Sequence, residues 1–365
     1  MAPPCARTLS SSMTGIDQGR GAASNRTGRF EAWSRAPLND GWSNADRHDL
    51  VLRTTLAVDA SRSIICYNRS PDVPFDRSIN PYRGCEHGCI YCFARPSHAW
   101  LGLSPGLDFE SRLIYKPQAA ALLAHELADP RYRCATITLG ANTDPYQPVE
   151  RKLALTRRIL ELLHRCCHPV AVVTKSALVE RDLDILADMA RQQLATVAVS
   201  ITTLDCALAR RLEPRAAAPK RRLGTIERLS AAGVPVTLLV APVIPVLTDG
   251  EMETIMQRGR AAGARSAGYT LLRLPLEVRD LFREWLDAHF PSARARICKR
   301  IRETQGGKDY DATFGARMRG TGEYAKLIAQ RFALACKRLG FADDIPLDSA
   351  QFQAPAPMQR QLSLF

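Results

Sequence analysis

Val170-Ala171-Val172-Val173-Thr174 is the clearest example of a pattern that repeats along the middle of the chain, in which β-branched runs alternate with stretches of helical apolar spacing. Strands are predicted at 135–139, 170–174, 196–201, 234–240 and 269–273, and helices at 119–128, 152–164, 183–193, 223–232, 251–262 and 281–288. This alternation predicts βαβ units with a parallel sheet and right-handed crossovers. It favours an open or partial (β/α) barrel, with a doubly wound sheet as the alternative. Both architectures place the chemistry at the carboxyl ends of the strands.

The composition around this core is that of an ordinary globular protein. The chain has 365 residues, of which 46% are hydrophobic and 24% charged, and these values exclude wholesale disorder and a fibrous repeat. The nearest candidate for a membrane span, 234–247, contains three prolines and is shorter than the ~18 residues needed to cross a bilayer. We therefore predict no membrane span.

Charge and cysteine content narrow the class of protein further. A total of 50 Lys and Arg against 37 Asp and Glu gives a net charge of +13. This charge favours a polyanionic partner, usually nucleic acid, with a generally basic composition as the equally weighted alternative. The start of the chain has no apolar leader, so we expect a cytoplasmic protein. Its 11 cysteines would then be reduced, which indicates metal or redox chemistry instead of a disulfide scaffold.

Four zones are predicted along the chain. Residues 1–60 are rich in Ser, Gly and Arg without a sustained period, and we expect a mobile or loosely packed extension there. The core domain is expected at 61–290, a helical segment at 291–343, and a flexible tail with three prolines at 344–365.

The strongest chemical signal is a short loop that contains Cys85, Cys89 and Cys92 together with two glycines. Such a loop can fold three thiolates around one small inorganic centre, and thiolates select zinc or an iron–sulfur cluster. A structural zinc ion would need a fourth ligand, for which His87 or His98 is the candidate. Three ligands on a four-iron cluster would instead leave one iron open for a substrate or cofactor.

The spacing CxxxCx(aromatic)C, in which Tyr91 is the aromatic residue, resembles the signature of the radical S-adenosylmethionine (SAM) superfamily. This resemblance implies a [4Fe–4S] cluster on Cys85, Cys89 and Cys92, an open iron that chelates SAM, and a place for Tyr91 near the adenine. It also implies an electron donor, reductive cleavage of SAM to a 5′-deoxyadenosyl radical, and a partial (β/α)6 barrel. The cofactor carries this chemistry and the protein positions it.

Further motifs, in the same order along the chain, resemble spore photoproduct lyase and its bacterial relatives. They are Thr143-Asp144-Pro145 with Glu150, Thr174-Lys175-Ser176, Arg181-Asp182, Ser200-Ile201-Thr202-Thr203, Leu212-Glu213-Pro214-Arg215 with Arg222, and Ala241-Pro242-Val243-Ile244-Pro245. The resemblance covers roughly residues 78–290. It implies a base or lesion in DNA as the substrate.

The same resemblance implies a SAM-binding set: Thr143, Asp144, Lys175, Ser200, Glu213 and Arg215. The first two would contact the amino end of SAM, and the next two its carboxylate and ribose. The last two would form an ion pair or a ribose contact. For Thr143 and Ser200 the alternative is a polar residue at a strand end that caps the next helix.

The chain departs from the lyase pattern in one respect. The lyase reaction uses a protein cysteine near the Thr-Asp motif to return a hydrogen atom, whereas residues 140–142 here are Gly, Ala and Asn. Cys134 lies on the entry side of its predicted strand. Most of the other cysteines, Cys166, Cys167, Cys206 and Cys298, are expected to be small core residues. No catalytic residue or hydrogen donor is therefore assigned.

Two basic runs are candidates for phosphate binding. The first contains Arg210, Arg211, Arg215, Lys220, Arg221 and Arg222, and the second lies at 294–302. The alternative is a solvated helix face. It is favoured for the second run because Ile297, Cys298 and Ile301 give that run an inner side.

The chain ends in Gln361-Leu362-Ser363-Leu364-Phe365, which resembles the bacterial sliding-clamp-binding pentapeptide. The motif implies Gln361, Leu362, Leu364 and Phe365 as contacts, presented to an apolar pocket by a Pro-containing tether. A C-terminal strand or a chance apolar ending is the alternative.

Three hypotheses follow from the sequence. The first is a radical SAM enzyme that acts on a DNA base or lesion. The second is the same chemistry on an RNA, a peptide or a small molecule. The third is a non-enzymatic iron–sulfur adaptor of the sliding clamp, which would leave SAM uncleaved.

Overall fold

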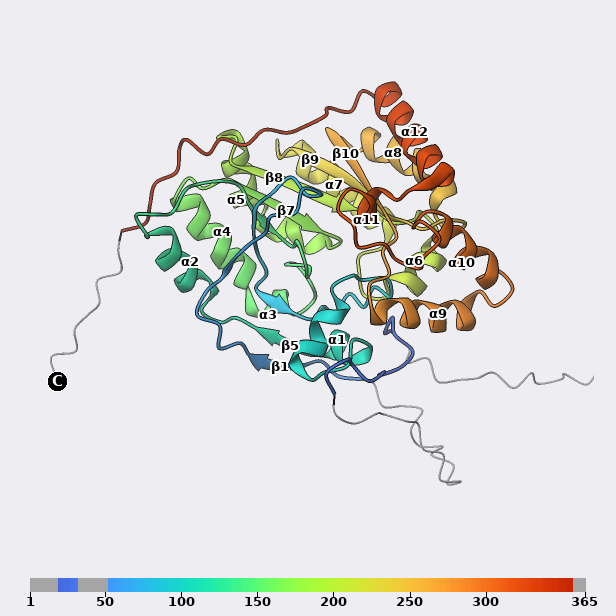
Figure 1. Ribbon diagram of the computed structural model, residues 1–365. Helices are drawn as coiled ribbons and strands as arrows, with labels where there is room; N and C mark the ends of the chain where they lie inside the picture. Colours follow the sequence, from blue (N-terminus) through green and yellow to red (C-terminus); the bar gives the residue numbers. More distant parts are fainter. Residues whose placement is uncertain (1–18, 32–51, 357–365) are drawn as a thin grey trace, which may run out of the picture.

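The computed structural model describes residues 19–31 and 52–356 (Figure 1). Its main sheet has the strand order β10-β9-β8-β7-β6-β3-β2. The strands are β2 (Ile65–Tyr67), β3 (Arg77–Ile79), β6 (Ile137–Leu139), β7 (Val170–Thr174), β8 (Ala195–Ser200), β9 (Val236–Val243) and β10 (Ser266–Leu271). β3 and β6 to β10 pair in parallel, and β2 pairs antiparallel with β3.

The strand order identifies the sheet as a partial barrel. A doubly wound sheet reverses its strand order at a switch point, whereas here each parallel strand lies beside the next one in the chain from β3 to β10. Within the described ranges, the sheet ends at β10 on one side and at β2 on the other, without closure between them. The predicted partial (β/α)6 barrel is confirmed, and it is open between β10 and the β2–β3 hairpin.

Helices connect the strands at almost all of the predicted positions. They are α2 (Ala119–Leu127), α3 (Glu150–Leu153), α4 (Leu155–Arg165), η3 (Ala177–Asp182), α5 (Leu183–Arg191), α6 (Cys206–Leu212), α7 (Pro219–Ala231), η4 (Asp249–Glu251), α8 (Met252–Ala261) and α9 (Glu277–His289). The single helix predicted at 152–164 is wrong in one detail. Ala154 has a φ of 50°, which ends α3 and starts α4.

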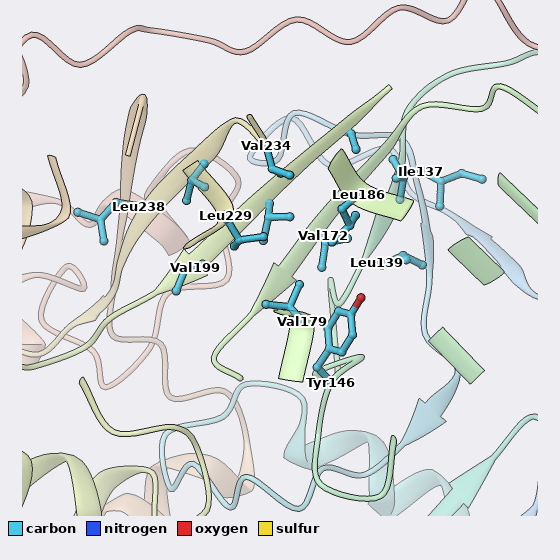
Figure 2. Close-up of a cluster of buried hydrophobic side chains, with 14 of the residues drawn as sticks. Ile137, Leu139, Tyr146, Val172, Val179, Leu186, Val199, Leu229, Val234 and Leu238 are labelled. Carbon is cyan, nitrogen blue, oxygen red and sulfur yellow. The ribbon is translucent and has the colours of Figure 1, made fainter. Parts of the chain in front are cut away.

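The core lies between the parallel strands and these helices. Figure 2 shows Val172 and Val199 from β7 and β8 beside Leu186 and Leu229 from α5 and α7, and all four side chains are fully buried. Alternate residues of β7 are buried, as expected for a β-branched strand with one face against helices. The same runs that predict the strands therefore supply most of the core.

A small second sheet supports the segment that contains the three cysteines. Its strand order is β1-β5-β4, with β1 at Thr55–Val58, β4 at Tyr82–Arg83 and β5 at Arg112–Tyr115. The cysteine loop connects β4 to η2 (Arg95–Leu101), and α1 (Leu107–Ser111) then leads back to β5. Both ends of the loop are thereby attached to one sheet.

The loop at 304–321 crosses the open side of the barrel. It connects α10 (Arg294–Glu303) to α12 (Gly322–Leu339) and contains α11 (Ala316–Arg319). At one end Gly320 lies so close to Leu271 of β10 that an added Cβ would approach that side chain to 2.6 Å. Nearer its middle, the Gly315 N–H and the Arg317 guanidinium both bond to Asp72, between β2 and β3. This loop therefore links the two edges of the open sheet.

The segment after α12 lies along the outside of the domain, and Figure 1 shows it reaching the neighbourhood of α2. Asp348 N–H donates to Gln193 O at 2.9 Å, and Phe352 packs edge-on against Tyr132 and His168. The described part of the predicted flexible tail is thus attached to the surface. The pentapeptide at 361–365 lies outside the described residues. No helix in the described part of the chain combines the length and apolarity needed to cross a membrane.

Candidate active site

The cysteine loop lies just beyond the carboxyl end of β3. Cys85 and Cys89 are buried and Cys92 is half-buried. Gly84 and Gly88 have φ values of 81° and 67°, a region that L-residues with a side chain rarely adopt. A Cβ on Gly84 would also approach Leu113 Cδ2 to 2.7 Å. The glycines therefore allow the tight turns that keep three cysteines on one short loop.

The donor set of this loop fits an iron–sulfur cluster. Burial raises the pKa of the Cys85 thiol well above its ordinary value, and the charge of Asp144 adds to this effect. Burial also raises the pKa of Cys89 and Cys92. Buried thiols of this kind become thiolates when a bound metal compensates their charge.

The geometry gives no support to the zinc alternative. His87 Nδ1 lies 3.3 Å from Asp144 Oδ2, and His98 Nε2 lies 3.0 Å from the backbone oxygen of Arg112. Across residues 19–31 and 52–356, no three Cys, His, Asp or Glu side chains converge as ligands of a single ion. A four-iron cluster does not need such convergence, because its thiolates bind different irons.

One side of the cysteine loop is closed by a group that we call the Arg95 cluster: Arg95, Glu110, Gly21 and Ala22. Arg95 and Glu110 form an ion pair with no exposed side-chain surface. Arg95 also donates to the backbone oxygens of Gly88 and Cys89 at 3.1 and 2.9 Å. Glu110 accepts from the N–H groups of Gly21 and Ala22, both at 2.8 Å. The ion pair therefore joins the cysteine loop to the N-terminal segment.

Residues 19–31 pack closely on the domain, whereas a mobile or loosely packed extension was predicted for residues 1–60. A Cβ on Gly21 would lie 1.7 Å from Gly88 O, so the two backbones are in direct contact. Ala22 is buried beside Cys89 in the smaller of two large apolar clusters. The segment is held by backbone amides, by a glycine contact and by single polar side chains such as Arg20 and Asn25, and none of these leaves a periodic pattern in the sequence.

A second group of polar side chains, which we call the Lys175 cluster, consists of Lys175, Ser200, Thr202, Glu213 and Tyr91. Lys175 follows β7, and its Nζ lies 2.8 Å from Ser200 Oγ, 3.1 Å from Thr202 Oγ1 and 3.1 Å from Glu213 Oε1. Tyr91 donates its hydroxyl hydrogen to Glu213, and its ring lies 5.7 Å from Lys175 Nζ. The structure therefore brings four of the predicted SAM-binding residues together at the carboxyl ends of β7 and β8.

Of the two roles predicted for Glu213 and Arg215, an ion pair between them is wrong, and a ribose contact stays a prediction. Glu213 bonds to Arg222 on α7, and Arg215 lies 3.2 Å from Glu86 instead. Burial opposes the ionisation of Glu213, but Arg222 and Lys175 together hold its pKa well below the ordinary value. In the sequence Arg222 stands in a basic run and at the end of the Glu213 motif, and the spacing of neither shows that it is buried against Glu213.

Asp144 connects the end of β7 to the cysteine loop. It accepts hydrogen bonds from Thr174 Oγ1 and from Lys175 N–H, both at 2.7 Å. Burial would raise the pKa of Asp144, but His87 and these hydrogen bonds lower it below the ordinary value. Thr143 donates its hydroxyl to Tyr82 O at 2.8 Å. In this arrangement both residues position the loop and the strand end, and their contacts with SAM stay predictions.

The first basic run is only partly available to a ligand. Arg215, Arg221 and Arg222 each pair with a glutamate of the domain. Arg210, Arg211 and Lys220 are exposed. The second run lies on α10, whose Ile297 and Ile301 are buried, so the solvated helix face is confirmed.

The remaining cysteines have mostly the packing that was expected. Cys166 and Cys167 pack in the main core, and Cys298 packs against the smaller cluster. Cys206 is exposed at the start of α6, so a core position was wrong for this residue.

Comparisons with known proteins agree with this geometry. A family model described as the radical SAM superfamily matches residues 79–259. An uncharacterized protein of Mycobacterium tuberculosis is 37% identical over 272 residues, which are 74% of this chain and 75% of that protein. An uncharacterized protein of Mycobacterium bovis matches with the same values.

Two solved structures share the fold. Spore photoproduct lyase complexed with dinucleoside spore photoproduct matches with a TM-score of 0.57 at 14% identity, over 79% of this chain and 81% of that one. A lyase mutant with bound AdoMet and the same dinucleoside matches with a TM-score of 0.57 at 14% identity, over 78% of each chain.

Proposed function

From the premise that the chain belongs to the radical SAM superfamily, we propose that this radical SAM enzyme acts on a base or lesion in DNA. Enzymes of this superfamily use a [4Fe–4S] cluster, reduced by an electron donor, to cleave SAM reductively. The observation that carries the proposal is the fold shared with a lyase whose structures contain a dinucleoside photoproduct. The net charge of +13 also favours a polyanionic substrate.

The residues at the strand ends suit the binding of SAM beside the cysteine loop. Cys85, Cys89 and Cys92 would hold the cluster. The ammonium of Lys175 would pair with the SAM carboxylate, since a hydrogen bond between two opposite charges is stronger than its bonds to the two neutral hydroxyls of Ser200 and Thr202. Ser200 and its neighbour Thr202 could then offer their hydroxyls to a ribose.

Glu213 and Arg222 have a positioning role in this proposal. The buried Arg222 guanidinium keeps Glu213 ionised, and the carboxylate in turn holds the Lys175 ammonium in place. Tyr91 joins this carboxylate to the cysteine loop. On the other side of the loop, the fully buried Arg95–Glu110 pair excludes water from the backbone of Gly88 and Cys89.

The C-terminal pentapeptide extends the same proposal. Docking of Gln361, Leu362, Leu364 and Phe365 on a bacterial sliding clamp would bring the enzyme to DNA. A short apolar motif of this length is sufficient for such a contact.

The test is the formation of 5′-deoxyadenosine by the anaerobically reconstituted and reduced protein, with intact DNA, with ultraviolet-irradiated DNA, or without DNA. We expect irradiated DNA to stimulate turnover at least severalfold over intact DNA. The Cys85→Ala variant should lose both the iron–sulfur absorbance and all turnover, while Cys66→Ala, an exposed cysteine on β2, should retain both.

Two other outcomes of this experiment would favour the alternative hypotheses. Turnover that is indifferent to DNA would contradict the DNA proposal and move the search to an RNA, a peptide or a small molecule. An iron-loaded protein that binds the clamp without cleaving SAM would favour the adaptor hypothesis.

A further inference from the structure

Among the described residues, Arg273 is a cation beside the cysteine loop that has no acidic partner. It lies two residues beyond the end of β10 and is half-buried. No residue in the described part of the chain forms a hydrogen bond or an ion pair with its guanidinium, which instead lies over the ring of Phe93 at 4.1 Å. Phe93 directly follows the cluster ligand Cys92 in the sequence.

The surroundings place Arg273 at the open side of the barrel. The charges that act on it come from Cys92 of the cysteine loop, from Asp72 in the β2–β3 connection, and from Tyr310 and Arg317 of the 304–321 loop. It therefore lies where these three segments approach one another. The Lys175 cluster comes from β7 and β8, in the middle of the sheet, and so belongs to another part of the site.

Arg317, Arg283 and Arg279 have acidic partners, whereas no acid in the described ranges pairs with Arg273. Arg317 binds both Asp72 and Ser70, so the nearby acid is already engaged. Arg283 pairs with Asp309 at 2.9 Å, and Arg279 pairs with Asp280 at 3.0 Å. Burial lowers the pKa of Arg273 below its ordinary value, yet an arginine keeps its charge at neutral pH. A half-buried and unpaired positive charge is costly, and an anion from outside the chain would compensate it.

The stacking on Phe93 leaves the donors of Arg273 available. A guanidinium that lies over a ring uses its flat face, while its N–H groups point outward in its own plane. This fork matches the two oxygens of a phosphate, which it binds in a bidentate manner. Phe93 itself is 41% exposed, so the pair faces the solvent side of the loop.

We propose that Arg273, oriented by Phe93, binds a backbone phosphate of the nucleic-acid substrate beside the nucleotide that enters the barrel. This inference rests on the proposed function, because it assumes that the substrate is a polynucleotide. It adds a specific phosphate site to that function, on the open side and separate from the Lys175 cluster.

The test compares variants of the reconstituted protein in their binding of a fluorescein-labelled single-stranded oligothymidylate, measured by anisotropy at several salt concentrations. For Arg273→Ala we expect affinity to fall about tenfold and the salt dependence to decrease by about one phosphate contact. Arg273→Lys keeps the charge but loses the fork, so its affinity should be intermediate. The matched control is Arg279→Ala, which removes an equal charge from a nearby exposed arginine paired with Asp280, and its affinity should stay within twofold of the wild type.

The same samples separate this inference from the proposed function. Equal unfolding temperatures and iron contents show that the Arg273→Ala protein is folded and loaded. If the wild type neither binds the oligonucleotide nor responds to irradiated DNA, the proposed function fails. If the wild type binds and Arg273→Ala binds equally well, only the inference is overturned. If Arg273→Ala loses affinity for SAM, measured by calorimetry, with unchanged oligonucleotide binding, Arg273 serves the cofactor and the inference is also overturned.

Discussion

The Arg95 cluster contains a buried arginine–carboxylate pair, Arg95–Glu110, and Glu213 of the Lys175 cluster forms a second such pair with Arg222. Their remaining partners differ. The first pair bonds to backbone groups of the cysteine loop and of the N-terminal segment. In the second pair Arg222 also donates to backbone oxygens, those of Ala217 and Ser200, but its carboxylate, Glu213, bonds to the ammonium of Lys175 and to side-chain hydroxyls. Backbone partners cannot leave without local unfolding, whereas ammonium and hydroxyl groups can rotate to a ligand. We therefore expect the Arg95 cluster to contribute mainly to stability, and the Lys175 cluster to exchange its internal hydrogen bonds for bonds to a ligand.

The largest expected effect comes from breaking the Arg95 cluster. Glu110→Ala leaves Arg95 buried without a counter-charge and leaves two backbone N–H groups unpaired, so we expect a loss of about 3–5 kcal/mol in the free energy of unfolding. Urea unfolding under anaerobic conditions measures this change in the free energy of unfolding. Glu323→Ala removes an exposed carboxylate on α12 and should leave the transition unchanged. A Glu110→Ala protein as stable as this control would show that the cluster has no structural role.

The second prediction concerns the stability of the protein at low pH, which should depend on His98. Burial lowers the pKa of His98 on η2 from 6.5 to about 4, and its Nδ1 is buried without a partner among the described residues. As the pH falls, His98 therefore becomes protonated near pH 6.5 in the unfolded chain but only near pH 4 in the folded protein. This contribution to stability is complete above pH 6.5 and is lost as the pH falls through that window, by about 2–3 kcal/mol at pH 4.5.

The histidine can be separated from other acid effects by comparing urea unfolding at pH 7 and pH 4.5. His98→Asn should lose less stability between these two values than the wild type does. His125→Asn, which replaces an exposed histidine on α2, should follow the wild type. An identical pH dependence for His98→Asn would assign the acid lability to other groups.

The smallest effect on stability, with the clearest effect on binding, should come from the Lys175 cluster. Lys175→Met removes the ammonium but leaves Glu213 paired with Arg222. We expect SAM affinity, measured by calorimetry on the loaded protein, to fall about tenfold or more with a small change in stability. Lys326→Met on the exposed face of α12 is the control. A Lys175→Met protein that binds SAM normally but unfolds easily would reverse the comparison between the two clusters.

Sequence reasoning predicted the parts of the molecule that depend on local pattern. β-branched runs located β6 to β10, and their order located Lys175 and Ser200 at neighbouring strand ends. Cysteine spacing identified the cluster loop. β3 was missed because a strand of three residues has no detectable period.

The parts that could not be predicted depend on contacts between distant residues. Arg222 resembles its neighbours in a basic run, and only the packing of α7 under β8 shows that it is buried against Glu213. The pair Arg95–Glu110 consists of two charged residues with no distinctive spacing. Gly21 and Ala22 bind Glu110 through backbone groups, so their side chains carry little information about the contact.

The contact between Gly21 and Gly88 has a practical consequence for handling the protein. The cysteine loop depends on Glu110, whose carboxylate accepts hydrogen bonds from N–H groups about 90 positions before it in the chain, a long-range closure that forms only after residue 110 has been synthesised. Shortening the N-terminus past residue 20, or placing a bulky tag close to it, would therefore alter the loop that receives the iron. Purified protein prepared in that way would load less cofactor even though every cysteine and every barrel strand is intact.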